Sequence, residues 1–337
     1  MKKLLSLLAA AGICLSGCSD SVRTPAEHNR ADQKHYSITV GLTYIPNIQF
    51  SPLYVAEKEG YFRDFGLDVT LRHHGAQEAL FGALSSGAED IVFAGADEMM
   101  QARDSGVDVV NWATMYQNYP VALISPKSAG IKSWTDLKGR RIGVPGPYGE
   151  NYFGLQSALR AHHLEKEVTV EYIGYTQAAA LKEKKVDAVI GFVNNDAVAL
   201  EKAGMEVDLL PIADKKEPNL IGVGFGSKRS GIRVQVYAKF LKAVEKAVRK
   251  AHSDPQAALT ATEKYVPSVK DPQTAEMTKE ILRRTLELYR GSGIFGRQDC
   301  GAWERMSHFL KEAGLVKKTV PAREAFTRSV TEAARKL

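Results

Sequence analysis

Polar and aromatic side chains gather where the strand-like runs of this chain end. The first run, Ile38 to Tyr44, leads into Tyr44-Ile45-Pro46-Asn47-Ile48-Gln49-Phe50, and a helix then begins at a proline. Asn47 and Gln49 can each donate and accept hydrogen bonds, which suits a neutral heterocycle with mixed edges. The alternative is a capped turn with one buried asparagine. Because ligands of open α/β sheets lie beyond the carboxyl ends of strands, we expect Asn47, Gln49 and Phe50 to contact a ligand.

Two carboxylates follow the third strand, in the run Ala94-Gly95-Ala96-Asp97-Glu98. In a structural interpretation, Asp97 caps the next helix and Glu98 complements its dipole. In a functional interpretation, one carboxylate accepts a hydrogen bond from a ligand N–H or hydroxyl group. The two roles are compatible, so both residues are candidates for the site.

An aromatic cluster comes next, formed by Trp112, Met115, Tyr116, Tyr119 and Pro120. Trp112 falls within a strand and is predicted to belong to the core. Aromatic faces stack on flat ligands and lose little entropy when they become ordered. Tyr116 and Tyr119 are therefore predicted to face the ligand.

A glycine-rich loop, Pro145 to Gly154, follows the strand that ends at Val144. Glycines let backbone N–H groups approach a ligand, and the start of the following helix favours an anion or a polar oxygen. The loop lacks the Lys-Ser/Thr pair of a P-loop. We expect Tyr148, Asn151 and Tyr152 to face the ligand from this side.

Two later strands also end in polar residues. Thr176 lies in Tyr175-Thr176-Gln177, and Asn194 lies in Phe192-Val193-Asn194-Asn195-Asp196. Both are predicted ligand contacts, although the two asparagines would serve equally well as helix caps.

Signatures of catalysis and of metal binding are missing from the sequence. The pairs His73-His74 and His162-His163 are adjacent and cannot point at one ion from one helix face; no His-Glu-x-x-His or Gly-x-Ser-x-Gly motif occurs. Cys300 is the only cysteine after the first 18 residues, so it has no disulfide partner. We expect no metal, no cofactor and no catalytic residue, and therefore not an enzyme.

Strand-like and helix-like segments alternate in a rhythm that predicts parallel sheets covered by helices. A first series comprises Ile38–Tyr44, Pro52–Phe62, Leu67–Leu71, Gln77–Ser85 and Asp90–Ala94, and a second comprises Arg141–Val144, Glu150–His162, Val168–Tyr172, Ala178–Lys185 and Ala188–Phe192. Long amphipathic helices follow at Val234–Ala251, Pro255–Lys264, Pro272–Tyr289 and Trp303–Glu312. The predicted fold class is α/β, with two lobes, each a mostly parallel sheet flanked by helices, and a helical C-terminal tail.

The chain is predicted to cross between the lobes at Pro120–Lys132 and Ala213–Gly222, and the tail to pack back on the first lobe. Lobe I then comprises residues 36–121 and 223–337, and lobe II residues 122–222. The crevice between two such lobes is the default ligand site.

The N-terminal sequence predicts that the protein is located outside the cytoplasm. Lys2 and Lys3 precede an apolar run of about a dozen residues, too short to span about 30 Å of hydrocarbon, which indicates a cleaved signal peptide over residues 1–17. The following Leu15-Ser16-Gly17-Cys18 resembles the lipobox of bacterial lipoproteins, in which the cysteine is diacylated. Residues 18–35 are polar and without apolar period, which predicts a lipidated flexible tether anchored at the cell membrane.

Composition excludes nucleic-acid binding as a function. The formal charge is +6, and the two lysines of the signal peptide contribute to it. Basic residues are scattered among acidic ones and form no stripe. An apolar content of 44% over the remaining chain is enough for two domains with cores of their own.

Several of these motifs together resemble the substrate-binding proteins of taurine, nitrate and thiamine-precursor ABC importers. The similar segments are Tyr44–Asn47, Pro52–Ala56, Gly60–Phe62, Gly66–Val69, Asp136–Val144 and Val186–Ala188. Within that family, Ile45–Phe50, Gln101–Arg103, Val144–Gly149 and Tyr175–Gln177 look most like riboflavin-binding lipoproteins. Binders of thiamine pyrimidine precursors tend to have an aromatic residue at the position of Ile45 and a histidine near Gln49 or Phe50, and this sequence departs from that pattern.

The resemblance implies a periplasmic-binding-protein fold of type II, whose lobes close on a ligand and then dock on a permease with its ATPase. The implied ligand is a heteroaromatic vitamin, with riboflavin favoured over an aminopyrimidine precursor of thiamine, and the implied binder is a monomer. Two alternatives of other classes share the fold: a pyrimidine synthase, which is a cytosolic enzyme with a cysteine-rich motif, and a membrane-tethered ligand sensor.

Overall fold

The computed structural model describes residues 35–75, 79–213, 219–291 and 293–337. The predicted signal peptide and the predicted tether with Cys18 lie outside these residues, except for His35. Among the described helices, none is long and apolar enough to cross a membrane.

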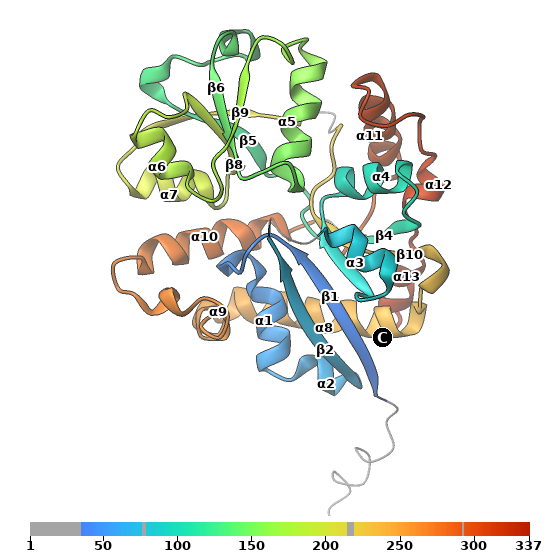
Figure 1. Cartoon of the computed structure of the whole chain (residues 1–337). Helices are drawn as coiled ribbons and strands as arrows, with labels where there is room; N and C mark the ends of the chain where they lie inside the picture. The colour runs from blue at the N-terminus through green and yellow to red at the C-terminus, as the bar shows by residue number, and fades with distance from the viewer. Residues whose placement is uncertain (1–34, 76–78, 214–218, 292) are drawn as a thin grey trace, which may run out of the picture. The chain divides into compact units, whose positions relative to one another are not determined.

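Sheet 1 has five strands in the order β2-β1-β3-β10-β4 (Figure 1). β1 pairs in parallel with β2 along its whole length and with β3 on its other side. β10 lies antiparallel between β3 and β4, so the other strands share one direction. The bounds are β1 (Tyr36–Thr43), β2 (Leu67–His74), β3 (Ile91–Ala94), β4 (Val109–Thr114) and β10 (Gly224–Lys228).

Sheet 2 repeats this arrangement with the order β7-β6-β8-β5-β9. β6 pairs in parallel with β7 and β8, and β5 lies antiparallel between β8 and β9. The bounds are β5 (Val121–Pro126), β6 (Arg141–Val144), β7 (Thr169–Tyr172), β8 (Ala188–Phe192) and β9 (Val207–Pro211). We use "lobe I" for the elements around sheet 1 and "lobe II" for those around sheet 2.

The antiparallel strand of each sheet is the one that directly follows a strand of the other sheet. β5 follows β4, and β10 follows β9, so the chain crosses between the sheets over residues 115–120 and again over 212–223. The predicted first crossing at Pro120–Lys132 was therefore placed too late. Residues Val121 to Ile124 are buried because β5 is an internal strand, and this continuous apolar run lacks the alternation that marks a half-buried strand.

Short helices and turns connect the strands. The predicted helix Pro52–Phe62 is two helices, because Gly60 adopts a left-handed conformation, with φ of 74°, between them. In lobe I these are α1 (Ser51–Lys58), α2 (Tyr61–Asp64), α3 (Leu80–Ser86) and α4 (Ala96–Asp104), with the 3-10 turn η1 (Ile48–Phe50). In lobe II they are α5 (Gly149–Ala161), α6 (Gln177–Lys182) and α7 (Asp196–Lys202), with η2 (Lys127–Ala129) and η3 (Trp134–Leu137).

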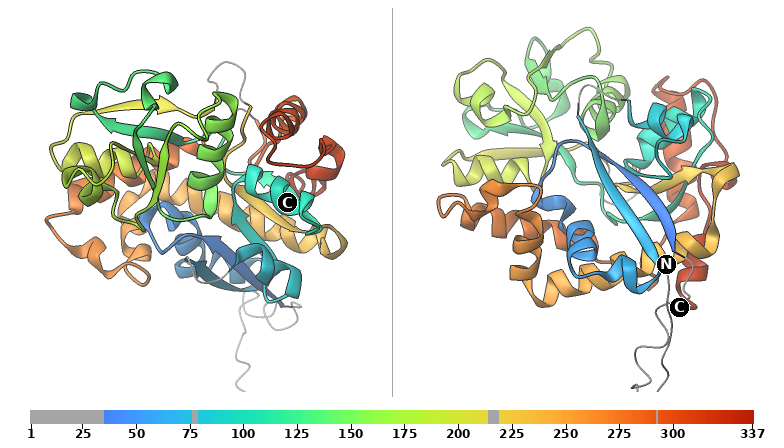
Figure 2. Two further views of the ribbon diagram at one scale, coloured as in Figure 1. Left: turned by 45° about the horizontal axis from the view of Figure 1, so that its top comes forward. Right: turned by 60° about the horizontal axis from the view of Figure 1, so that its bottom comes forward.

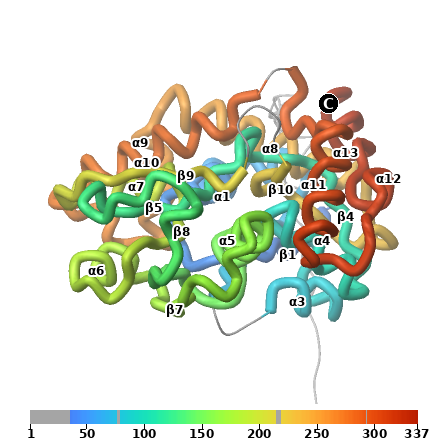
Figure 3. Tube along the Cα trace, turned by 90° about the horizontal axis from the view of Figure 1, so that it is seen from above, coloured from blue at the N-terminus to red at the C-terminus, as the bar shows by residue number. Residues whose placement is uncertain are grey.

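The helical C-terminal part packs mainly on lobe I. Helix α8 contacts α1, α2 and α13, and Figures 2 and 3 show it running along sheet 1. Helix α10 also contacts α7 of lobe II, where Arg284 pairs with Glu201 at 2.8 Å. The bounds are α8 (Val234–Ser253), α9 (Pro255–Thr262), α10 (Ala275–Leu288), α11 (Cys300–Glu312), α12 (Ala322–Ala325) and α13 (Ser329–Ala334), with η4 (Arg229–Gly231) and η5 (Pro267–Lys270).

An aromatic stack connects sheet 1 to α8. Trp112 of β4 is fully buried, as predicted, with its ring stacked on Phe225 at 5.4 Å and on Tyr237 at 5.5 Å between centroids. Phe225 of β10 also packs edge-on against Phe240 at 5.1 Å. These contacts hold the returning strand β10 against the core of lobe I.

We expect Phe225→Ala to lower the free energy of unfolding by about 3–5 kcal/mol, since it leaves a cavity beside Trp112. Leu209→Ala, on β9 with 41% of its side chain exposed, serves as the control and should cost less than about 1 kcal/mol. Denaturant unfolding measures both. A loss below about 1 kcal/mol for Phe225→Ala would show that β10 is not held by this stack.

Candidate ligand-binding site

An outer cavity of about 220 Å³ lies where strand ends of both lobes meet. It opens between the segment after β1 and η1, in lobe I, and the segments after β6, β7 and β8, in lobe II. Its lining is formed by Tyr44, Ile45, Asn47, Gln49, Phe50, Pro145, Asn151, Tyr175, Gln177, Phe192, Asn195 and Asp196.

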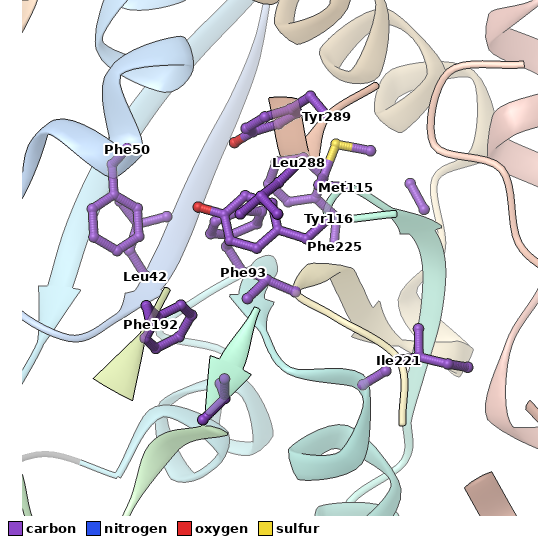
Figure 4. Packing of buried hydrophobic residues seen from close by; sticks show 14 of the residues in the cluster. Leu42, Phe50, Phe93, Met115, Tyr116, Phe192, Ile221, Phe225, Leu288 and Tyr289 are labelled. Carbon is purple, nitrogen blue, oxygen red and sulfur yellow. The ribbon is translucent and has the colours of Figure 1, made fainter. Parts of the chain in front are cut away.

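A smaller inner compartment of about 30 Å³ adjoins it, and four residues line both spaces: Tyr44, Gln49, Phe50 and Phe192. Figure 4 shows Phe50, Phe93, Phe192 and Tyr116 around the apolar part of this region. The rest of the inner lining is Thr43, Ala94, Gly95, Glu98, Glu150 and Val223. Two carboxyl groups therefore stand in a mostly apolar compartment.

Tyr44 connects the two lobes across this region. Its hydroxyl group accepts a hydrogen bond from the backbone N–H of Asn151 at 3.1 Å and donates to Oδ1 of the same residue at 3.2 Å. The hydroxyl fits because residue 149 is a glycine, since a Cβ there would lie 2.2 Å from it. Tyr44 has φ of 74°, a conformation that costs a non-glycine residue about 1 kcal/mol or more. The cross-lobe bonds hold it there.

Three carboxyl groups are buried together at the contact between α4 and α5. Asp97, Glu98 and Glu150 are 0%, 5% and 0% exposed. Burial is the main cause that raises the pKa of each of them, and the pKa of Glu98 rises to about 8, with Asp97 contributing. A buried carboxylate without a cation is unfavourable, so the neutral acid is the favoured form.

Glu98, and not Asp97 as the sequence predicts, makes the capping contact at the start of α4, because Gly95 is the N-cap residue and Asp97 already lies inside the helix. Glu98 accepts a hydrogen bond from the backbone N–H of Gly95 at 3.1 Å, which completes a capping box at the start of α4. Asp97 accepts from the N–H of Glu98 at 2.9 Å and from the hydroxyl group of Tyr119 at 3.0 Å. Only Glu98 of the pair also lines the inner compartment.

The structure brings half of the predicted site residues to one of these two spaces: Asn47, Gln49, Phe50, Glu98, Tyr116 and Asn151. Asn47 also caps η1 through a hydrogen bond from the N–H of Gln49 at 3.2 Å. Tyr148 stands at the rim, where its hydroxyl group donates to that of Tyr175 at 3.0 Å. Asp97 and Tyr119 lie behind the lining and bond to each other.

The other three predicted residues also line neither space and make contacts elsewhere. Tyr152 packs against Phe153 and Tyr172, because its place on α5 lies on another face than that of Asn151. Thr176 donates to the carbonyl of Ile173 at 2.6 Å, a local turn bond.

Asn194 is the third of these residues. Its side chain is buried and donates to the hydroxyl group of Thr285 on α10 at 2.8 Å, so it braces lobe II against the C-terminal part. The predicted role of Asn194 as a ligand contact does not fit this position.

Several lining residues were not singled out from the sequence, although they lie in the same strand-end runs: Tyr44, Glu150, Tyr175, Gln177, Phe192, Asn195 and Asp196. The available signal was their place directly after a predicted strand. What the sequence does not contain is the direction of each side chain, which depends on how the lobes meet.

A third and larger cavity, of about 660 Å³, lies at the two crossings and reaches α11. Tyr116 and Tyr119 line it, but it shares only Tyr116 with the inner compartment and no residue with the outer cavity. It contains no residue of the loop between β6 and α5. The candidate site is therefore formed by the two spaces at the strand ends of β1, β3, β6 and β8.

In the described part of the chain, no group of three histidine, cysteine or acidic side chains is placed to hold a metal ion.

Two α/β lobes with sheets of the same order, joined by two crossings around strand-end cavities, define a two-lobed periplasmic-binding-protein fold of type II. The chain belongs to the NMT1/THI5-like family, whose model matches residues 47–258. The alkanesulfonate-binding protein SsuA from Xanthomonas axonopodis pv. citri has a similar structure, with a TM-score of 0.66, 19% identity and coverage of 87% of this chain and 99% of that one.

Proteins similar in sequence to this chain include two named as binding proteins and one named as a synthase. The riboflavin-binding protein RibY of Chloroflexus aurantiacus is 30% identical over 90% of this chain and 88% of its own. The formylaminopyrimidine-binding protein of Halalkalibacterium halodurans is 24% identical over 98% and 99%. A 4-amino-5-hydroxymethyl-2-methylpyrimidine phosphate synthase of Legionella pneumophila is 22% identical over 86% and 90%.

The raised pKa of Glu98 predicts a pH dependence of stability. An unperturbed glutamate titrates near about 4.3, so the contribution of the neutral Glu98 is complete below that pH and is lost as the pH rises towards about 8. Glu98→Gln stays neutral and keeps an acceptor for Gly95. Between about pH 5 and 8.5, the wild type should therefore lose at least about 1.4 kcal/mol more free energy of unfolding than Glu98→Gln does.

Denaturant unfolding at several pH values checks this expectation. Glu165→Gln, at an exposed carboxylate on the surface of lobe II, is the control and should follow the wild type. An equal loss in wild type and Glu98→Gln would show that Glu98 does not bind a proton on folding.

Proposed function

We propose that this chain is the extracytoplasmic substrate-binding lipoprotein of an ABC importer and that it captures a heteroaromatic vitamin, with riboflavin favoured. The observation that carries the proposal is the lining of the outer cavity. It combines four aromatic rings, Tyr44, Phe50, Tyr175 and Phe192, with five amide side chains, Asn47, Gln49, Asn151, Gln177 and Asn195.

Rings and amides together suit a flat ligand that is rich in heteroatoms. The ring of Tyr44 lies at right angles to those of Phe192 and Tyr175, with centroids 5.8 and 6.4 Å apart, and all three rings line the outer cavity, where a flat ligand could stack. The amide of Asn151 already bonds to Tyr44 and to the carbonyl of Ile190, so the other four amides are the ones that can donate and accept towards the ring edge and the hydroxylated chain of riboflavin. The name of the RibY relative, at 30% identity, supports the same ligand.

The charges around the site disfavour an anionic ligand. The described lining of the outer cavity and the inner compartment includes no lysine or arginine. The start of α5, which would otherwise attract an anion, carries Glu150 in its first turn. A sulfonate or a phosphate ester would therefore bring a negative charge next to buried acids with no cation to compensate it. A neutral vitamin would not carry this cost.

Capture follows from closure of the lobes on the ligand. Residues from lobe I, such as Tyr44 and Phe50, and from lobe II, such as Asn151 and Tyr175, are brought together only when the lobes are close. The bonds from Tyr44 to Asn151 hold this close arrangement, and a permease would distinguish it from the open one. Delivery to a permease and its ATPase completes the proposed transport role.

The second candidate is a binder of a thiamine pyrimidine precursor in the same transport role. It is favoured by the match to the formylaminopyrimidine-binding relative over 98% of this chain and by the modest outer cavity. A synthase activity is less well supported, because no histidine, cysteine or lysine is found in the described lining of the two spaces. A sensor role would use the same site and differ only in the partner.

We expect the wild type to bind riboflavin in a 1:1 complex without turnover, seen as quenching of flavin fluorescence and as intact riboflavin in the mass spectrum of released ligand. Tyr175→Ala should weaken binding by at least about 1 kcal/mol, since a stacking ring is lost. Tyr172→Ala is the control, because Tyr172 lies on β7 with 59% exposure and does not line the cavity. If only an aminopyrimidine binds, the second candidate is correct. If neither compound binds, the proposed vitamin ligand is wrong.

The proposed membrane anchoring depends on lipidation of Cys18. In a bacterial host, the wild type should fractionate with membranes and carry the mass of a diacylglycerol-modified N-terminal cysteine, while Cys18→Ala should be recovered in the soluble fraction. Cys300→Ala, at an exposed free cysteine, is the control and should stay with the membranes. Membrane association of Cys18→Ala equal to that of the wild type would contradict lipidation at this residue.

A further inference from the structure

The Glu150 side chain is buried without a hydrogen-bond partner in the described part of the chain, which is unfavourable for a carboxyl group. It belongs to the first turn of α5, a position that is commonly solvated, yet it is 0% exposed. Neither carboxyl oxygen has a hydrogen-bond partner among the described residues. A buried polar group without a partner costs about 1–3 kcal/mol, so packing alone does not explain a glutamate here.

The backbone opposite Glu150 is shaped to admit it. A Cβ on Gly95 would lie 2.4 Å from Cγ of Glu150 and 3.0 Å from its carboxyl carbon, so only glycine at position 95 leaves this room. The carboxyl group of Glu98 lies next to it and interacts with the backbone N–H group of Glu150. Both carboxyl groups line the inner compartment, whose other walls include Phe50, Phe93 and Phe192.

We propose that Glu150, together with Glu98, recognises the polar edge of the ligand. A ring N–H or amino group, with an acceptor beside it, enters the inner compartment and forms hydrogen bonds with these carboxyl groups. The proposal rests on the function proposed above and narrows its substrate class to heteroaromatic rings that present a donor next to an acceptor. The compartment, at about 30 Å³, has room for one such edge and not for a whole ring.

The chemistry of a neutral carboxyl group matches that edge. A neutral carboxyl group donates through its O–H and accepts through its carbonyl oxygen, and both atoms lie in one plane. This pattern complements the adjacent donor and acceptor on the edge of an aminopyrimidine or of a flavin imide. The titratable groups that face Glu150 are Asp97 and Glu98 from α4 and Tyr44 after β1, with Tyr116 and Tyr119 from the first crossing. None of them is a cation, so the neutral form of Glu150 is the one that binds.

Two substitutions separate this role from a structural one. Glu150→Gln is nearly isosteric and keeps a donor beside an acceptor, while Glu150→Met keeps the volume and removes both. We expect Glu150→Met to raise the melting temperature, because a buried group without partners is removed, and to weaken ligand binding about tenfold or more. Glu150→Gln should bind within about threefold of the wild type at pH 6.

The pH profile gives a further readout. Affinity of the wild type should fall as the pH rises, because the carboxyl group must be protonated in the complex, and Glu150→Gln should show a smaller fall. Tyr152→Ala, also in the first turns of α5 but outside both spaces, is the control and should keep wild-type affinity.

The probes are riboflavin, 4-amino-5-hydroxymethyl-2-methylpyrimidine and the fragment 2-aminopyrimidine, measured by calorimetry. If neither vitamin-type probe binds but the fragment does, and Glu150→Met abolishes that binding, the proposed function fails and this inference stands. If the wild type binds none of the three, both are wrong.

Two outcomes overturn the inference alone. Unchanged affinity of Glu150→Met for a probe that the wild type binds would mean that Glu150 makes no ligand contact and is hydrated by water. A parallel loss of melting temperature and affinity in both Glu150→Met and Glu150→Gln would show that Glu150 is a structural residue.

Discussion

The close arrangement of the two lobes depends on the contact between Glu150 of α5 and the backbone of Gly95 at the end of β3. A Cβ at position 95 would overlap Cγ of Glu150 and Oδ1 of Asp97, so a larger residue there would displace the buried acid side chains. The same approach brings the backbone of α5 to the Glu98 carboxyl group and puts Asn151 within reach of the Tyr44 hydroxyl group. One small residue therefore permits the buried acid cluster and the cross-lobe hydrogen bonds together.

The topology explains why these contacts fall at one place. Both sheets have the same strand order, and each receives its antiparallel strand straight from the other sheet, so the chain passes twice between the lobes. The segments after β1 and β3 then face those after β6 and β8. Helix α10 adds a brace between the C-terminal part and lobe II through the Asn194 and Arg284 contacts.

The sequence predicted the fold better than the site. Turn residues and apolar runs located β1, β6 and β8 and the long C-terminal helices within a few residues, but β5 was read as part of a crossing because both of its faces are buried. Asn47, Gln49, Phe50 and Asn151, predicted as ligand contacts, line the outer cavity, and their contact with a ligand stays a prediction. Which neighbour faces inward, Asn151 or Tyr152, Asn195 or Asn194, depends on helix phase and lobe contact, which a single sequence does not contain.

In the proposed transport role, the acids buried at the lobe contact make closure of the lobes depend on what occupies that contact. In the open arrangement, water would solvate Glu98 and Glu150 and they would ionise near their usual pKa; closure removes that water and raises both pKa values. Closure is then favoured only when protons, or donors of a ligand, satisfy the carboxyl groups. A ligand shifts the lobes towards the closed form by its differential affinity for that form, and each donor placed against these acids adds to that difference. An anion would subtract from it, so the acid pair would favour closure on neutral, donor-bearing rings over closure on the acidic solutes bound by other proteins of this fold.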